Sequence, residues 1–488
     1  MSLYEKILEK NMDKREHDLA IVCDELRYTY VELEELVCQM AQQLKNRGIE
    51  KGSKVILRYK NPFQFTLFLL ALLKNEAIPM PVYHGISASK LEKIIVYYEI
   101  NFVITEAVNG FLKGQQTEVS SCGIQFFIYN YWDDKDISLN EVKLILFTSG
   151  TTSTPKAIML TEENIYSNVM AICKYLKIGC EDSLLLVKDL SHSSSIIGEL
   201  FVGLISGCKI VLTTKLSLSS TILKILQKEK IGVFFAVPTL LKGIMNYKRL
   251  TQFDLSKLKI INFYGASMHE NDILKLINIF PEVNIIYSYG QTEASPRVTY
   301  IEKKDLLLHS ASCGRPIENV NISIVDDTGK PLFPYESGEI VVSGPNVMLG
   351  YYKNEDKTKI AKRDGKLYTG DLGYMDEFGF LYVTGRIDNM IISGGKNIYP
   401  EEIEGVLTTN EDISEALVIS TNKENEVSEL TAYVVMKEEK EFDYNKVFYF
   451  CRKHLEDYKI PKDIVVVKEL QKTPSGKIKR GQFNTNVR

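Results

Sequence analysis

The sequence predicts an α/β protein with a large, multi-layer N-terminal domain that includes a β-rich subdomain, followed by a small α+β C-terminal domain. Three observations lead to this prediction. The chain has 488 residues, 45% of them hydrophobic, which is more than one ordinary core accommodates. Short apolar runs alternate with longer amphipathic segments over much of the chain. The residue pattern then changes near residue 314 and again near residue 388.

The alternation in the first part predicts βαβ units with parallel strands. Segments with the spacing of amphipathic helices lie at residues 91–100, 161–176 and 219–230. The predicted strands around them include Lys54–Arg58, Asn101–Thr105, Leu184–Val187 and Lys209–Thr213.

From about residue 314, pairs such as Asp-Thr-Gly and Ser-Gly-Glu punctuate short strands, which predicts the β-rich subdomain. About a hundred residues after Arg386 form a compact, domain-sized unit of their own. We place the boundary near Asp388, so that the domains cover residues 1–387 and 388–488. The smaller unit contains predicted helices at 401–407 and 445–455 and predicted strands at 416–419 and 430–435.

Composition excludes several classes of function. The net charge of −4 and the absence of a basic cluster argue against nucleic acid or anionic lipid as a partner. The N-terminus lacks the apolar core of a signal peptide, and the longest apolar run, Phe65–Leu73, is too short to span a membrane. Eight cysteines without a Cys-x-x-Cys pair are typical of free thiols in a reducing compartment. We therefore expect a soluble cytoplasmic protein.

The most informative segment is the loop that follows the apolar strand beginning at Leu144. Its glycine permits unusual backbone angles, its hydroxyls can donate to phosphate oxygens, and its lysine adds a cation. The loop is no Walker A motif, because Gly-x4-Gly-Lys-Ser/Thr is absent. Phosphate binding and a merely solvated Ser/Thr loop both remain open for it. The residues concerned are Thr148, Ser149, Gly150, Thr151, Thr152, Ser153, Thr154 and Lys156.

Two further motifs combine aromatic, hydroxyl and carboxylate groups. Tyr289-Gly-Gln-Thr-Glu293 follows an apolar strand and offers a ring for a base, a hydroxyl for phosphate and a carboxylate for a hard cation. The alternative is a helix start capped by Thr292. Tyr368-Thr-Gly-Asp371 ends in a carboxylate that can accept two hydrogen bonds, as from a ribose, although a type I turn is the common alternative.

The last two motifs lie in and before the small domain. Gly385–Glu404 contains Gly394 and Gly395, and taken locally it predicts a β-hairpin with a Gly-Gly turn. Lys472–Arg480 carries Lys477 beside a glycine, which suits a lysine on a flexible turn. The alternative interpretation of this segment is a basic surface tail.

In this order the motifs resemble those of the adenylate-forming superfamily, which contains acyl- and aryl-CoA synthetases, adenylation domains of non-ribosomal peptide synthetases, and firefly luciferase. Acyl- and aryl-CoA ligases are the most similar members, and the likeness covers residues 144–480. Ser153 departs from it, because most members carry a second glycine there. The resemblance implies ATP and Mg²⁺ as cofactors, a carboxylic acid as substrate, and CoA or the phosphopantetheine of an acyl carrier protein as acceptor.

The resemblance also implies residue roles. Tyr289 would stack on adenine, with Gly290 beside it in the same nucleotide-binding motif, Thr292 would contact the α-phosphate, and Glu293 would be the magnesium ligand. Asp371 would accept hydrogen bonds from both ribose hydroxyls, and Arg386 would reach the ribose or a phosphate. The loop from Thr148 to Lys156 would hold the phosphates. Lys477 would bridge the substrate carboxylate and the α-phosphate. The small domain would be mobile about a hinge at Asp388, and Gly394 and Gly395 would leave a path for the pantetheine arm.

The same resemblance implies an acyl pocket. His192 would lie beside the acyl carbonyl, although a packed or capping histidine is the alternative. Gly265, Ala266 and Ser267 would back both adenine and the acyl group. Arg297 stands where an apolar residue is frequent, and a buried guanidinium requires an anionic or polar partner. That partner could be Glu199 or a polar tail of the substrate, while a surface or internally paired arginine remains the alternative.

Three functions are therefore open. The first is an acyl- or aryl-CoA ligase that forms acyl-AMP and passes the acyl group to CoA. The second is a stand-alone enzyme that loads a carrier protein. The third is a nucleotide-binding regulator without catalysis, against which the presence of Lys477, Glu293 and Asp371 argues.

Overall fold

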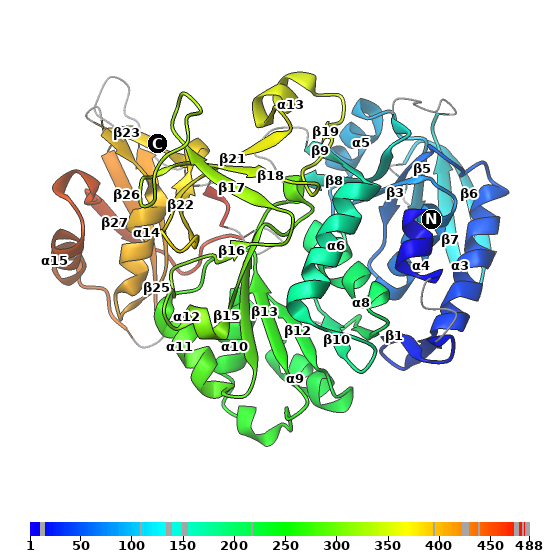
Figure 1. Ribbon diagram of the computed structural model, residues 1–488, viewed down its shortest axis with the longest axis horizontal. Coiled ribbons are helices and arrows are strands. Elements are labelled where there is room, and N and C mark those ends of the chain that lie inside the picture. The colour runs from blue at the N-terminus through cyan, green and yellow to red at the C-terminus, as the bar shows by residue number, and fades with distance from the viewer. Residues whose placement is uncertain are drawn as a thin grey trace.

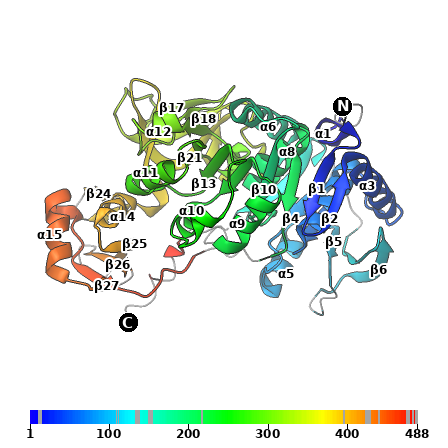
Figure 2. The ribbon, with the colours of Figure 1, turned by 90° about the horizontal axis from the view of Figure 1, so that it is seen from below.

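The computed structural model confirms the predicted α/β fold, with a large N-terminal domain and a small C-terminal one (Figure 1). Figures 1 and 2 both show the C-terminal helices α14 (Pro400–Thr409) and α15 (Tyr444–His454) at the opposite end of the molecule from the N-terminus. No described helix is both long and apolar enough to cross a membrane. The structure describes residues 1–9, 15–107, 110, 112–132, 139–148, 155–215, 218–393, 396–421, 429–437, 440–472, 478–480 and 483.

The largest sheet has nine strands, and its centre is parallel as predicted. Antiparallel pairs close it at both edges. In sheet order the strands are β16 (Arg315–Pro316), β15 (Thr299–Glu302), β14 (Asn284–Tyr289), β13 (Ile260–Tyr264), β12 (Val233–Ala236), β10 (Ser183–Leu186), β11 (Lys209–Leu212), β1 (Leu19–Cys23) and β2 (Leu26–Thr29).

A second sheet occupies the N-terminal end, and its first three strands are parallel. Its order is β4 (Ile78–Pro81), β3 (Lys54–Arg58), β5 (Phe102–Thr105), β7 (Ile124–Asn130) and β6 (Gln115–Ser121). A small antiparallel sheet adjoins it and consists of β8 (Val142–Thr148), β9 (Lys156–Thr161) and β19 (Gly350–Tyr351).

The predicted β-rich part is an antiparallel sheet. It contains β17 (Asn321–Val325), β18 (Gly338–Ser343), β21 (Lys366–Met375), β20 (Lys362–Arg363) and β22 (Leu381–Arg386). The C-terminal unit has the hairpin β23 (Ile391–Ser393) and β24 (Lys396–Ile398), and the sheet β25 (Ile413–Thr421), β26 (Glu429–Met436) and β27 (Asp463–Val466).

Local sequence explains where the helices begin. Helix α4 starts with Pro62, and Asn61 before it accepts hydrogen bonds from two backbone N–H groups of the first turn. Helix α6 begins after Thr161, which forms a reciprocal capping box with Asn164. With these two, the longer helices of the N-terminal part are α3 (Tyr30–Lys45), α4 (Pro62–Lys74), α5 (Ala88–Tyr97), α6 (Glu162–Leu176), α9 (Ser219–Lys228), α10 (Pro238–Met245), α11 (Glu270–Ile279) and α13 (Glu355–Ala361).

The hydrophobic core is divided in a way that matters for the site. One large cluster of buried side chains runs from Leu3 to Leu381, whereas a separate cluster in the small domain begins at Ile391. The segment between them, residues 382–390, contains the last strand of the β-rich sheet and the one-turn helix η6 (Ile387–Asn389). Two of its side chains, Tyr382 and Val383, pack against the large cluster.

Candidate active site

The predicted motifs meet at one edge of the nine-stranded sheet. Strands β10, β12, β13 and β14 are parallel, so the loops that follow them all emerge at the same side. These loops begin at Val187, Gly265 and Gly290 for β10, β13 and β14. Gly265 has a φ of +90°, and Gly265, Ala266 and Ser267 are exposed. The fold thus brings together segments about a hundred residues apart in sequence.

Three predicted nucleotide-binding side chains form one hydrogen-bonded group. The Tyr289 hydroxyl donates to Asp371 Oδ2 at 2.5 Å, and Arg386 Nη1 donates to Asp371 Oδ1 at 2.6 Å. Burial and the neighbouring carboxylate raise the pKa of Tyr289 well above its usual range, so its hydroxyl stays protonated. Asp371 is itself buried, and its two carboxylate oxygens accept from an aromatic hydroxyl and a guanidinium.

The turn predicted at Tyr368–Asp371 is wrong. These residues lie inside strand β21, and Asp371 pairs directly with Arg386 on β22. This part of the strand is locally irregular. Its pairing with β18 shifts register here, and Gly370 has a left-handed backbone conformation with a φ of +71°. The cross-strand pairing is what places carboxylate and guanidinium together.

A second group surrounds Glu293, which is buried in the short helix η5 (Thr292–Ala294). The Tyr351 hydroxyl donates to Glu293 Oε1 at 3.0 Å. The ammonium of Lys156 lies 5.1 Å from the centre of the same Tyr351 ring. Burial, and then Glu293, raise the pKa of Tyr351, which keeps the hydroxyl available as a donor. Tyr351 thus joins the carboxylate to the cation.

The helix start predicted as an alternative for this motif is present, because η5 begins at Thr292, but the predicted cap by Thr292 is wrong, since Gln291 precedes the helix and no side chain caps it. Instead, the Thr292 hydroxyl lies 3.1 Å from that of Ser193. His192 directly precedes helix α7 (Ser193–Ser195) and also provides no side-chain cap. Thr292 and the His192 segment, from the loops after β14 and β10, are therefore in contact.

The turn between Gly290 and Arg297 is held by close backbone contact. A Cβ on Gly290 would lie 1.9 Å from the carbonyl oxygen of Pro296, so no larger residue fits there. Asn168 of helix α6 donates to the carbonyl oxygens of Ala294 and Arg297 and accepts from the Arg297 N–H at 3.2 Å. Asn346 donates to the same two carbonyls. The two buried amides thereby fix the position of Glu293.

Arg297 is buried, with 3% of its surface exposed, and lies with its guanidinium carbon 4.0 Å from the centre of the Tyr264 ring. The Tyr264 hydroxyl donates to Glu199, which is fully buried. Among the described residues no ion pair within 4.0 Å joins Arg297 to Glu199. The predicted alternative of a surface arginine is therefore wrong, and a direct Glu199 partner is not observed.

Several predicted residues lie outside the described part of the chain. These are Ser149, Gly150, Thr151, Thr152, Gly394, Gly395 and Lys477, together with Ser153 and Thr154. Their described neighbours agree with the predicted local structure. Thr148 and Lys156 are cross-strand partners on β8 and β9, and Ser393 pairs with Lys396 in the predicted hairpin. Asp388 is exposed in η6 and lies 3.6 Å from the Arg386 guanidinium.

Sequence reasoning missed four residues that organise this edge: Tyr351, Asn168, Asn346 and Ser193. Tyr351 lies in no motif that we identified, and nothing local distinguishes Asn168 from the other polar residues of its helix. Only the tertiary contacts reveal their roles. Ser193 belongs to a predicted segment, but its contact with Thr292 is also visible only in the tertiary structure, because β12 and β13 separate β10 from β14 in the sheet.

The chemistry of Glu293 fits a hard cation. Within the described residues, no group of three or more His, Cys, Asp or Glu side chains could enclose a metal ion. Mg²⁺ does not need such a group, because it usually takes one or two carboxylates and completes its shell with water and substrate phosphates. A single buried carboxylate oriented by Tyr351 satisfies that requirement.

Comparisons with known proteins agree with this geometry. The 2-succinylbenzoate–CoA ligase of Bacillus cereus (strain AH820) is 28% identical over 476 residues, 96% of this chain and 95% of that protein. A feruloyl-CoA synthase from an Amycolatopsis species is 28% identical over 459 residues, 93% of each.

The solved structure of the o-succinylbenzoate CoA synthetase of Bacillus subtilis with its acyl-adenylate intermediate has a TM-score of 0.85 at 25% identity, and covers 100% of this chain and 99% of that one. That enzyme is also known in complex with ATP and magnesium ion, with a TM-score of 0.84, 25% identity and 99% coverage of both chains. The family model for the AMP-binding enzyme C-terminal domain matches residues 402–477. The model for the AMP-binding enzymes themselves matches residues 8–352, and this chain belongs to that family.

Proposed function

We propose that this chain is an AMP-forming acid–CoA ligase. In the first half-reaction, a carboxylate oxygen of the substrate attacks the α-phosphorus of ATP, the bond from that phosphorus to the bridging oxygen breaks, and pyrophosphate leaves. In the second, the CoA thiol loses its proton and attacks the carbonyl carbon of the acyl-AMP. AMP then departs with the oxygen that came from the acid, and the acyl-CoA thioester remains.

The observation that carries the proposal is the presence of two side-chain groups, one around Asp371 and one around Glu293. Tyr289, Asp371 and Arg386 form an aromatic, acceptor and cationic set that suits adenosine. Glu293 and Lys156, joined through Tyr351, form a set that suits phosphates with a cation. The short segment Tyr289–Glu293 contributes one side chain to each set, so the two sets lie next to each other.

Charge neutralisation is the main task in nucleotidyl transfer. Mg²⁺, held by Glu293, would offset the charge of the pyrophosphate. Lys156 adds a positive charge on the same side, and its contact with the Tyr351 ring restricts where the ammonium can lie. Thr292 lies beside Ser193 and can donate to an α-phosphate oxygen. The backbone clamp at Asn168 keeps these groups in register.

We assign the two half-reactions to different faces of the small domain, with the boundary near Asp388. Lys477 would serve acyl-AMP formation, and the hairpin containing Gly394 and Gly395 would admit the pantetheine arm for thiol transfer. The separate hydrophobic clusters on the two sides of residues 382–390 support a rigid-body rotation there. The phosphate role of Ser149, Gly150, Thr151 and Thr152 rests on the sequence motif and on its two described flanks, Thr148 and Lys156.

We propose CoA as the acceptor because the full-length relatives described above are CoA ligases or synthetases. Loading of a carrier protein has no such support in the described residues or the comparisons. The cysteine pattern is the basis on which we propose a cytoplasmic location.

The test is an acid-dependent pyrophosphate exchange assay over short, long-chain, aromatic and dicarboxylic acids, followed by incubation with CoA or with a phosphopantetheinylated carrier. We expect exchange with a subset of acids, and an acyl-CoA with AMP when CoA is added. Exchange without transfer to CoA, but with transfer to the carrier, would show that the acceptor is wrong. Binding of ATP without acid-dependent exchange would show that the protein is no ligase.

A further inference from the structure

A buried charged cluster lies next to the nucleotide site and takes no part in the chemistry derived above. It comprises Arg297 from the turn after β14, Tyr264 at the end of β13, and Glu199 and Lys188 from the segment after β10. All four come from the sheet edge that carries the proposed site. We propose, on the basis of the function proposed above, that this cluster binds a second carboxylate at the far end of the substrate, and that the substrate is therefore a dicarboxylic acid.

Arg297 has hydrogen-bonding capacity that the described protein does not use. Its Nε and Nη2 atoms are buried and find no hydrogen-bond partner among the described residues. The guanidinium stacks on the Tyr264 ring at 4.0 Å, and Nη2 lies 3.4 Å from the position of a Cβ on Gly198. The absence of a side chain at Gly198 thus leaves room beside the guanidinium. Buried charged donors without partners are costly, and a ligand that satisfies them recovers that cost.

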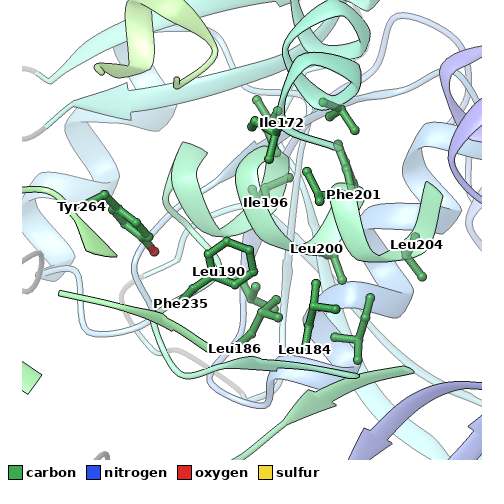
Figure 3. Close-up of a cluster of buried hydrophobic side chains, with 14 of the residues drawn as sticks. Ile172, Leu184, Leu186, Leu190, Ile196, Leu200, Phe201, Leu204, Phe235 and Tyr264 are labelled. Carbon is green, nitrogen blue, oxygen red and sulfur yellow. The ribbon is translucent and has the colours of Figure 1, made fainter. Parts of the chain in front are cut away.

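Glu199 does not neutralise this arginine by direct pairing. It accepts from the Tyr264 hydroxyl, while its Oε2 finds no partner in the described structure. The pKa of Glu199 is raised to about 7, chiefly by burial. This effect outweighs the lowering of the pKa by the hydrogen bond from Tyr264 and by the positive charges of Arg297 and Lys188. Figure 3 shows the apolar surroundings of the helical segment that carries Glu199, with Ile196 and Leu200 on it and Leu190 and Phe235 nearby.

The local charge favours an anion. Two cations, Arg297 and Lys188, face the same Tyr264 ring at 4.0 and 5.1 Å, and Lys188 also donates to Ser194. Among the four described side chains that define the cluster, the only carboxylate is that of Glu199, and it does not pair directly with Arg297. A second substrate carboxylate would accept from Nε and Nη2 as a bidentate pair, the geometry that a guanidinium provides.

The backbone around Glu199 is also unusual. Residues Ile196–Phe201 form a π-helical turn within an otherwise α-helical segment that begins at Ser193. Such turns occur mostly where a helix has been adapted to a binding or catalytic role. A purely structural arginine would be expected to pair with the nearby Glu199, and a purely apolar acyl pocket would have no use for either side chain.

The experiment measures pyrophosphate exchange with α,ω-dicarboxylic acids of increasing chain length and with benzene-based dicarboxylic acids. Each diacid is compared with its own half methyl ester and with the monocarboxylic acid of equal length. For the best diacid, we expect kcat/KM to exceed that of the half ester by about tenfold or more, since one charge-assisted pair is at stake. This comparison uses the unmodified protein and so does not depend on any variant folding.

Arg297→Met should lose the preference, because it should slow the diacid about tenfold more than it slows the half ester, with the difference mainly in KM. Arg297→Lys should retain part of the preference, because the charge remains but the forked geometry is lost. Arg315→Met is the matched control, since Arg315 also stacks on an aromatic ring, Phe380 at 4.2 Å, but lies exposed and away from the cluster.

Equal use of diacid and half ester by the unmodified protein would overturn the inference, as would a diacid preference that survives Arg297→Met. Either result leaves the proposed ligase function intact, because acid-dependent exchange would still be observed. If no acid of any class supports exchange, the proposed function itself fails, and the dicarboxylic substrate fails with it.

Discussion

Tyr351 offers the sharpest test of how the phosphate side of the site is organised. Its hydroxyl donates to Glu293 at 3.0 Å, and its ring contacts the Lys156 ammonium at 5.1 Å. Tyr351→Phe removes the first contact and keeps the second, whereas Tyr351→Leu removes both. The two variants therefore separate the orientation of the carboxylate from the position of the cation.

The magnitudes follow from the kind of contact. A hydrogen bond to a charged group contributes roughly 1.5–3 kcal/mol, which corresponds to about a 10- to 100-fold change in rate or affinity. Tyr351→Phe should thus reduce adenylation by that factor at limiting magnesium, and raised magnesium should partly restore it. Loss of the cation–π contact adds roughly 0.5–2 kcal/mol, so Tyr351→Leu should be slower still.

The assay is acid-dependent pyrophosphate exchange as a function of magnesium concentration. Tyr352→Phe is the matched control: Tyr352 is the next residue, is equally buried, and its hydroxyl accepts from Lys54 at 3.1 Å instead of contacting Glu293. This control should keep the magnesium dependence of the unmodified protein. If Tyr351→Phe also keeps it, the hydroxyl does not orient a magnesium ligand, and our reasoning about Glu293 is wrong.

Three further predictions follow from other parts of the site. Because the pKa of Glu199 is raised from 4.5 to about 7 in the folded protein, the stability that its protonated form contributes is complete below pH 4.5 and is lost as the pH rises through 7. Chemical denaturation would measure the free energy of unfolding of the unmodified protein and of Glu199→Gln at each pH. The difference between the two should fall by up to roughly 3 kcal/mol between pH 5 and pH 8, and a difference that stays constant would contradict this. Asn168→Asp should reduce both the free energy of unfolding and pyrophosphate exchange as much as Asn168→Ala does, because the two carbonyl oxygens that Asn168 binds require a donor. Full exchange activity in either variant would show that Asn168 does not position Glu293. Lys477→Ala should abolish pyrophosphate exchange but leave thioester formation from synthetic acyl-AMP, and Asp388→Pro should do the reverse because proline restricts backbone rotation; equal damage in both assays would argue against domain rotation.

The sequence was a good guide to elements and to the order of motifs. The strands at 54–58 and 260–264 and the helix after Thr161 are local features, decided by apolar runs, spacing and a capping residue. The small domain was also predictable, since its helices and strands are separated by clear turns. Parallel β10, β13 and β14 follow from the βαβ pattern, and they explain why three distant motifs share one edge.

What could not be predicted depends on pairings between distant strands. Tyr368–Asp371 has the composition of a turn, yet the antiparallel partner β22 holds it in a strand and places Arg386 opposite Asp371. The strand β19 is only two residues long, and its pairing with β9 is what carries Tyr351 to Lys156. No local pattern contains that information, because hydrogen bonds to another segment decide it.

The acyl side shows the same limit. Arg297 was recognisable as unusual from its residue type alone, and the expectation that it is either exposed or paired was reasonable. The structure instead buries it against Tyr264, with Glu199 bonded elsewhere. Burial and partner choice at such a position are set by how three loops pack together at the sheet edge.

Transfer of an isotopic label would establish whether acyl-AMP is formed. The preferred acid, labelled with ¹⁸O in its carboxylate, is incubated with ATP, magnesium and CoA, and the nucleotide products are examined by mass spectrometry. Attack of the carboxylate on the α-phosphorus predicts AMP carrying one ¹⁸O atom, pyrophosphate without label, and an acyl-CoA that retains the other ¹⁸O. Label in inorganic phosphate together with ADP would mean attack on the γ-phosphorus, and unlabelled AMP would mean that water, not the acid, is the nucleophile; either result would contradict an adenylate-forming ligase.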